Sequence, residues 1–184
     1  MTALAVVGGL LVAVGFAVVA AYNRFVSQRQ FVENSWSTVE TELQRRYELV
    51  PNLVATVKGY ATHERETFEA VIMARSAAVA DHGSPDHQAE TENVLVGALS
   101  RLMAVSEAYP ELKADAQFAD LQHQLVITED RIQAARRLFN RNVRDYNTRV
   151  EQVPSNLVAK LSGFERAAYV EIEAVAAELP AVSL

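Results

Sequence analysis

A histidine–glutamate pair is the first candidate for metal chemistry in the sequence. His63-Glu64 opens the zinc-protease pattern, in which a second histidine four residues later faces the same metal. Residue 67 is Thr67, so the pattern fails. We interpret His63 and Glu64 as charged residues on a helix face.

A second candidate lies where the sequence predicts a loop. His82 and His87 flank it, with Asp81 and Asp86 nearby, and two histidines with two carboxylates could hold zinc. The favoured alternative is a flexible polar loop without metal. His123 has no obvious partner in the sequence. We therefore predict no catalytic residue, no metal ligand and no cofactor.

Four polar residues occupy or border positions that helical periodicity assigns to the core: Arg46, Glu64, Arg75 and Asn142. Buried charges must be paired, and a polar residue in a heptad seam fixes register. We interpret these residues as inter-helix salt bridges and register locks. A catalytic carboxylate would need a pocket, and a narrow bundle gives no hint of one.

Arginines are concentrated near the end of the longest predicted helix: Arg136, Arg137, Arg141, Arg144 and Arg149. Acidic residues interleave with them: Glu129, Asp130, Asp145 and Glu151. The mixture predicts a solvated face rather than a site for an anionic ligand.

The N-terminal segment has no charged residue before Arg24. Ala3 to Ala21 is an unbroken apolar run, and at ~1.5 Å per residue a helix of that length nearly crosses a ~30 Å hydrocarbon core. We predict that residues 1–22 are a transmembrane anchor. A cleaved signal peptide is the alternative, but the run lacks a basic start and exceeds the usual length of about 7–15 residues.

Charge and composition bound the remaining residues, 23–184, which we expect to form one domain. Arg24 and Arg29 follow the span and no cation precedes it, so the positive-inside rule places the body in the cytoplasm. The net charge of −6 makes nucleic acid a poor partner. The absence of cysteine excludes disulfides, thiol catalysis and cysteine-ligated metals.

The body is predicted to be all-α, an elongated antiparallel bundle of long helices that follows the transmembrane helix. The first helix continues to about Val50, where Pro51 should kink or end it, and the second covers about 52–80. One stripe of this first helix should face the core of the bundle: Val32, Trp36, Val39, Leu43, Arg46 and Val50. The third helix covers about 87–108.

The fourth predicted helix, about 115–153, is the longest. Large apolar or aromatic residues recur in it at intervals of seven: Phe118, Leu125, Ile132, Phe139, Tyr146 and Val153. A strict heptad indicates coiled-coil-like packing. A short helix starting at Ser155 should end at Gly163, and a last helical segment should cover 169–179.

Several longer strings are more specific than these patterns. They include residues 45–54 (RRYELVPNLV), 58–64 (KGYATHE), 107–114 (EAYPELKA), 128–137 (TEDRIQAARR), 143–147 (VRDYN) and 154–156 (PSN). In this order they resemble the LemA family of bacterial membrane proteins. Two departures are Phe139 before Asn140, where the family often has tyrosine, and Val170 after Tyr169, where a second aromatic is common. The second leaves the docking of the C-terminal tail open.

The resemblance implies a single-pass protein of the bacterial inner membrane with a long helical domain and no enzymatic activity. Some family members are linked to a membrane metalloprotease, and a relative helps to build magnetosome membranes. We therefore expect a scaffold or adaptor whose partners are the lipid bilayer and a membrane protease or other membrane protein. A hydrolytic or metal-dependent enzyme and a membrane stress sensor are the alternatives.

A homo-oligomer is also expected. Phe25, Phe31, Val32 and Trp36 follow the anchor, and we expect them to lie beyond the rest of the bundle. Apolar side chains exposed there would be covered by lipid, a partner or a second copy.

Overall fold

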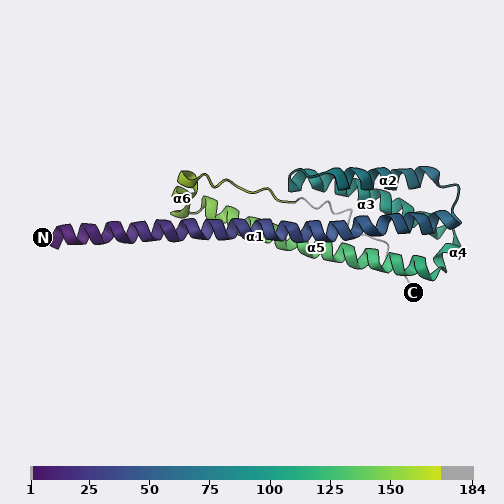
Figure 1. The fold of residues 1–184 in the computed structure, drawn as a ribbon, viewed down its shortest axis with the longest axis horizontal. Coiled ribbons are helices and arrows are strands. Elements are labelled where there is room, and N and C mark those ends of the chain that lie inside the picture. Colours follow the sequence, from purple (N-terminus) through teal and green to yellow (C-terminus); the bar gives the residue numbers. More distant parts are fainter. Residues whose placement is uncertain (1, 171–184) are drawn as a thin grey trace.

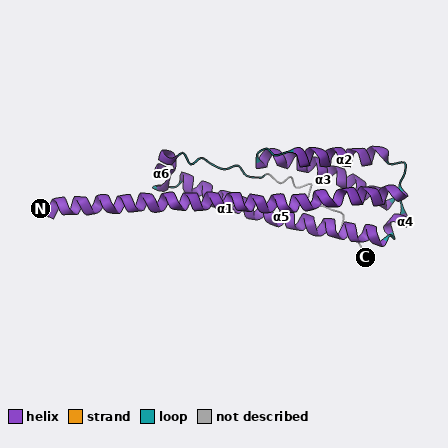
Figure 2. Ribbon diagram, in the orientation of Figure 1, coloured by secondary structure: helices purple, strands orange, loops and turns teal. Residues whose placement is uncertain are grey.

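The computed structural model describes residues 2–170 of the chain. Its elements are all helical: α1 (Thr2–Tyr60), α2 (Arg65–Ala80), α3 (Pro85–Glu107), α4 (Pro110–Lys113), α5 (Ala116–Glu151) and α6 (Ser155–Ser162). Within residues 2–170 there is no strand (Figure 2). The all-α prediction is confirmed.

The helices form an elongated bundle around α1 (Figure 1). Helix α5 runs antiparallel beside α1, and the α2–α3 hairpin packs on the part of α1 that is distant from the N-terminus. Helix α6 folds back against α1 at the opposite end of the body. The predicted bundle architecture is therefore confirmed.

Helix α1 joins the charge-free segment to the body without a break. Within the described part of the chain, it is the one helix that is long and apolar enough to cross a membrane. The side chains of residues 2–20 are all exposed, whereas Phe25 is fully buried. The segment that would contact lipid and the segment that packs in the body thus belong to one helix of 59 residues.

Of the two outcomes predicted at Pro51, a kink or a helix end, the helix end is wrong, because α1 continues through this proline to Tyr60. Proline lacks the N–H that would bond to the carbonyl four residues earlier, which belongs to Tyr47. Nε of Arg75 donates to this carbonyl oxygen at 2.7 Å. A side chain from α2 thus replaces the missing donor, and the chain turns at residues 61–64 instead.

The heptad of the fourth predicted helix faces the core of the bundle. Five of its six positions are buried: Phe118, Leu125, Ile132, Phe139 and Tyr146. The sixth, Val153, lies beyond the end of α5 and is 74% exposed, so the prediction fails there. Gly163 ends α6 as predicted, in the left-handed region at φ 71°.

A second, smaller core forms where the body meets the charge-free segment. It consists of Phe25, Tyr146, Ala159 and Phe164. Val32 and Trp36 are half-buried, and the Trp36 ring lies 5.2 Å from that of Phe139. Of the four apolar residues expected to be exposed at the start of the body, only Phe31 is in fact exposed, at 59%.

Residues 164–170, here called the C-terminal strap, run without helix along α5. The amide of Asn140 exchanges two hydrogen bonds with the backbone of Val170, at 2.9 and 3.0 Å. Asn147 does the same with Ala167, at 2.9 Å in both directions. Tyr169 and Val170 are not helical, and the remainder of the predicted last helix lies outside the described residues.

The spacing of the two asparagines matches the strap. Seven residues of α-helix rise ~10.5 Å, and three residues of extended chain span ~10 Å. Val170 is 3% exposed, so a valine docks here without a second aromatic residue. The question that the sequence left open is answered for the strap itself.

Candidate functional site

The structure does not assemble the histidine candidates into a metal centre. His63 and Glu64 lie in the turn between α1 and α2, so their predicted position on a helix face is wrong, and His82 is exposed. Of the loop residues, Asp81 and His87 come together, with Nδ1 of His87 2.9 Å from the carboxylate. Among residues 2–170, no group of three metal-binding side chains occurs.

Asp81 instead organises the loop between α2 and α3. Its carboxylate accepts hydrogen bonds from the Gly83 N–H at 2.9 Å and from the Thr91 hydroxyl at 3.0 Å. The Gly83 bond, followed by those of His87 and Thr91, holds the pKa of Asp81 below its ordinary value. The acidic group that could have bound zinc is thus used to fix a turn.

A buried charge cluster joins α1, α3 and α5 in the middle of the body. Arg46 is fully buried, and its guanidinium contacts the carboxylates of Glu92 and Glu129, the latter at 2.8 Å. The Tyr47 hydroxyl donates to the other oxygen of Glu92. We call Arg46, Tyr47, Glu92, Glu129 and Arg136 the Arg46 cluster.

Arg136 balances the charge of this cluster. It is 3% exposed, and burial, followed by the charge of Arg46, lowers its pKa. An arginine remains charged despite such a shift. Two guanidinium groups therefore offset two carboxylates, and the pairing leaves neither carboxylate free to act as a catalytic acid or base.

The four polar residues predicted to face the core have different fates. Arg46 is buried and paired as expected. Arg75 is half-buried and serves the Tyr47 carbonyl. Asn142, which is half-buried, donates to the carbonyl of Phe31 at 3.3 Å. Glu64 is half-buried just before the N-terminal end of α2, and its side chain makes no capping bond there.

The predicted solvated face is wrong for two of its members. Glu129 and Arg136 are buried in the Arg46 cluster, whereas Arg137, Arg141 and Arg144 are exposed. Glu92 was not among the polar residues predicted to face the core. A signal was present, because Glu92 precedes Leu95 by three residues and Leu99 by seven, which places it on the buried stripe of α3.

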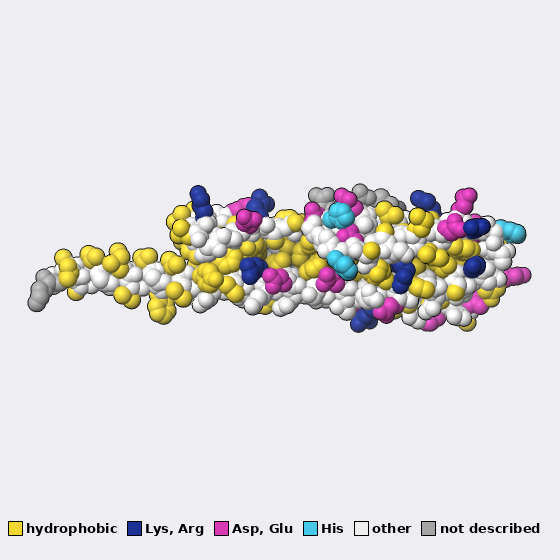
Figure 3. All heavy atoms as spheres, turned by 45° about the horizontal axis from the view of Figure 1, so that its top comes forward, with side chains coloured by type: hydrophobic (Ala, Val, Ile, Leu, Met, Phe, Trp, Pro, Cys, Tyr) yellow, Lys and Arg dark blue, Asp and Glu magenta, His cyan; other side chains and the backbone are white. Residues whose placement is uncertain are grey.

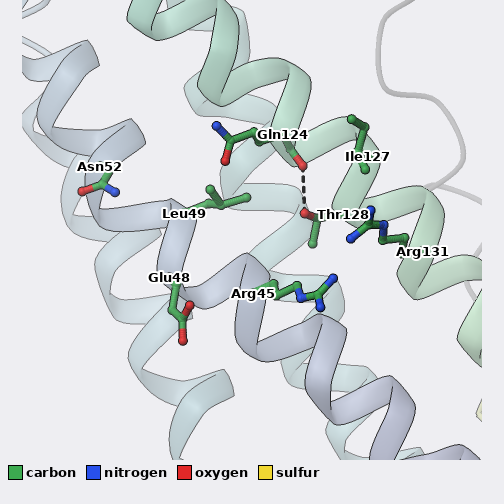
Figure 4. Close-up of a pocket in the computed structure, with 8 residues that line it drawn as sticks. All are labelled: Arg45, Glu48, Leu49, Asn52, Gln124, Ile127, Thr128 and Arg131. Atoms are coloured by element: carbon green, nitrogen blue, oxygen red, sulfur yellow. Dashed lines mark hydrogen bonds between the residues drawn. The ribbon is translucent and has the colours of Figure 1, made fainter.

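A surface groove of about 460 Å³ lies between α1 and α5. Figure 4 shows Arg45 of α1 and Arg131 of α5 extending toward the same space, with Leu49 and Ile127 at its walls. The Thr128 hydroxyl is turned inward to the Gln124 carbonyl, at 2.8 Å. The α1–α5 groove thus combines exposed cations with apolar surface, a composition found at protein–protein interfaces.

The comparisons with known proteins agree with this architecture. The model of the LemA family matches residues 35–184. The chain belongs to the LemA family. The magnetosome protein MamQ 2 of Paramagnetospirillum magneticum is 30% identical over 88% of this chain and 68% of its own length. Protein LemA of Metamycoplasma hominis is 24% identical over 79% of this chain and 66% of its own.

Membership of the LemA family and an N-terminal apolar helix together indicate a membrane-associated protein. MamQ of Magnetospirillum gryphiswaldense is also similar, at 29% identity over 80% of this chain and 64% of its own length. None of these names is that of an enzyme.

Proposed function

We propose that this LemA-family protein is a non-enzymatic, membrane-anchored scaffold that holds a partner at a fixed position above the bilayer. The supporting observation is the continuity of α1, which passes from the charge-free segment into the core without a linker. From Tyr22 to Tyr60 a helix rises ~57 Å. A rigid connection of this kind sets the distance and the orientation of a bound partner, which a flexible tether would not.

In this proposal residues 1–22 are the anchor and residues 23–184 the body of a single-pass protein of the inner membrane. The positive charges of Arg24 and Arg29 next to the anchor support a cytoplasmic body. Reporter fusions at Leu184 test the topology. An active periplasmic reporter together with an inactive cytoplasmic one would show that the body is periplasmic instead.

The α1–α5 groove is the surface that we propose for the partner, a membrane protease or another membrane protein. The name of the MamQ relatives, a magnetosome protein, suggests a role in membrane organisation as a second context. Arg131 is exposed and Arg45 is 49% exposed in its ion pair with Glu42, so both can reach carboxylates on a partner.

Site-specific photocrosslinking in native membranes tests this surface. A photoreactive residue at Ile127, within the groove, should give a discrete adduct with a membrane protein, and Arg131→Glu should weaken it. The control position is Met73, which is 72% exposed on α2. Equal labelling from both positions, or stoichiometric metal with hydrolytic turnover in the purified protein, would overturn the scaffold proposal.

A second copy of the chain is a further proposed partner, through the anchor. Apart from the backbone of their own helix, Gly8, Gly9 and Gly15 have no atom within 4 Å of the position that a Cβ would take, so another helix could approach closely there. Phe31, farther along the same helix, adds an exposed aromatic ring that a second copy could cover. The mass of the full-length protein in nanodiscs, compared with that of a chain starting near Asn34, tests this. A monomeric full-length protein contradicts it.

A further inference from the structure

Helix α6 packs against the charge-free part of α1 and encloses an apolar groove of about 640 Å³. The α1 wall consists of residues three, four and seven positions apart from the first, which share one helix face: Val14, Ala17, Val18 and Ala21. Leu157 and Leu161 of α6 form part of the opposite wall. Because the α1 wall belongs to the segment proposed to span the bilayer, this inference rests on the proposed anchor.

The α6 side of this groove is apolar and exposed. Leu161 is 88% exposed, Leu157 is 61% exposed, and Val153, in the turn before α6, is 74% exposed. The opposite side of α6 buries Ala159 in the small core. Figure 3 shows hydrophobic side chains at the end of the body that adjoins the extended helix. In water, such a group of large apolar side chains would be unfavourable.

The depth of α6 explains this exposure. Val14 and Ala21 precede Arg24 by ten and three residues, which corresponds to ~15 and ~5 Å along the helix. If Arg24 lies at the headgroups, α6 lies in the boundary between headgroups and acyl chains. Amphipathic helices bury their apolar side ~5–10 Å into this boundary.

The mouth of the groove is cationic. Arg149 lines it, and burial, followed by the charge of nearby Arg24, lowers the pKa of Arg149. Within residues 2–170, neither arginine forms a salt bridge, and Nε of Arg149 is buried without a hydrogen-bond partner. Arg149 at the mouth of the groove, with the charge of Arg24 close enough to act on it, is suited to a phosphate at a bilayer surface.

We propose that the α1–α6 groove binds one anionic phospholipid of the leaflet that faces the body. An acyl chain lies along Val14, Val18 and Leu161, and the phosphate lies against Arg149 and Arg24. The lipid covers the apolar walls and supplies the negative charge that the two arginines lack.

Fluorescence in nanodiscs tests where α6 lies. The chain has no cysteine, so Leu161→Cys, Leu10→Cys and Met73→Cys each introduce a single site for an environment-sensitive dye. We expect the dyes at residues 10 and 161 to shift to the blue and to be quenched by brominated acyl chains, and the dye at 73 to remain aqueous. An aqueous dye at residue 10 would contradict the anchor itself.

If the dye at residue 10 is in lipid, two outcomes would overturn the proposal that the α1–α6 groove binds a phospholipid. One is an aqueous dye at residue 161. The other is a blue-shifted dye there that brominated lipid does not quench, because protein then covers α6.

Lipid retention tests the headgroup. Full-length protein is extracted from bilayers containing phosphatidylglycerol and phosphatidylcholine, and bound lipid is counted by native mass spectrometry. Loss of one cation near an anionic phosphate should lower binding about fivefold, so Arg149→Gln and Arg24→Gln should each reduce retained phosphatidylglycerol by about that factor. Arg137→Gln, at an exposed position on the same helix, is the matched control. Unchanged retention in both variants, or equal loss in the control, overturns the proposal.

Discussion

Nε of Arg75 donates a hydrogen bond to the backbone carbonyl of Tyr47, the carbonyl that Pro51 leaves without its helical donor. This contact joins α2 to α1 and accounts for the continuation of α1 through a proline. Arg75→Ala should therefore destabilise the body by ~1–3 kcal/mol, because it leaves a buried carbonyl unsatisfied. Thermal or urea unfolding measures the change.

The dependence on Pro51 distinguishes this role from general packing. Pro51→Ala restores the N–H, so Arg75→Ala should cost clearly less in the Pro51→Ala background than in the natural chain. Additive effects of the two substitutions would show that the carbonyl does not depend on Arg75.

The Arg46 cluster gives a second prediction. Arg46→Met removes the cation shared by Glu92 and Glu129, and the loss of one partner from a buried pair costs ~3–5 kcal/mol. Adding Glu92→Gln rebalances the cluster, because Glu129 and Arg136 remain, and should recover part of the loss. Arg45→Met, one residue away and half-exposed, is the control and should cost less than ~1 kcal/mol. Similar losses at residues 45 and 46 would refute the assignment.

The strap gives a third prediction, on dynamics. Asn140→Ala and Asn147→Ala each remove two hydrogen bonds to the strap, so the amides of Val170 and Ala167 should exchange with solvent faster. Hydrogen exchange measured by mass spectrometry reports this directly. Asn142→Ala, on the same helix but bonded to Phe31, should leave both amides unchanged. Slow exchange in all three variants would mean that other contacts hold the strap.

A fourth prediction concerns acid. The Asp115 carboxylate caps α5 through the Phe118 N–H at 2.8 Å and accepts from Tyr60 at 2.8 Å. These bonds, Phe118 first, lower the pKa of Asp115 below its ordinary value of 3.8. The folded state therefore binds fewer protons than the unfolded state near this pH. The stabilisation is complete above about pH 3.8 and is lost as the pH falls through the lower folded pKa.

Asp115→Asn provides the matched variant, because asparagine also caps helices but does not titrate. Unfolding measured between neutral and acidic pH should show a weaker acid dependence in this variant. An identical pH profile in the variant and the natural chain would show that Asp115 does not contribute to the acid dependence of stability.

The sequence predicted helices and buried stripes well, because periodicity records which side of a helix is apolar. It identified Arg46 as buried but not its partners, since Glu92 and Glu129 come from helices that only the folded bundle brings together. The helix end predicted at Pro51 was wrong for the same reason. The hydrogen bond that the proline cannot make is replaced by one from Arg75, which lies 28 residues from Tyr47. The strap was missed because Asn140 and Asn147 bond backbone, which carries no sequence pattern.

The central claim is that α1 holds the body rigidly above the bilayer. Thr62→Cys places a label in the turn after α1, and energy transfer to labelled lipid headgroups in nanodiscs measures its height above the membrane. We expect one narrow distribution of label heights near ~57 Å for an upright helix, and slightly smaller heights with the usual tilt of ~20°. A broad distribution, or a label that lies close to the headgroups, would contradict it.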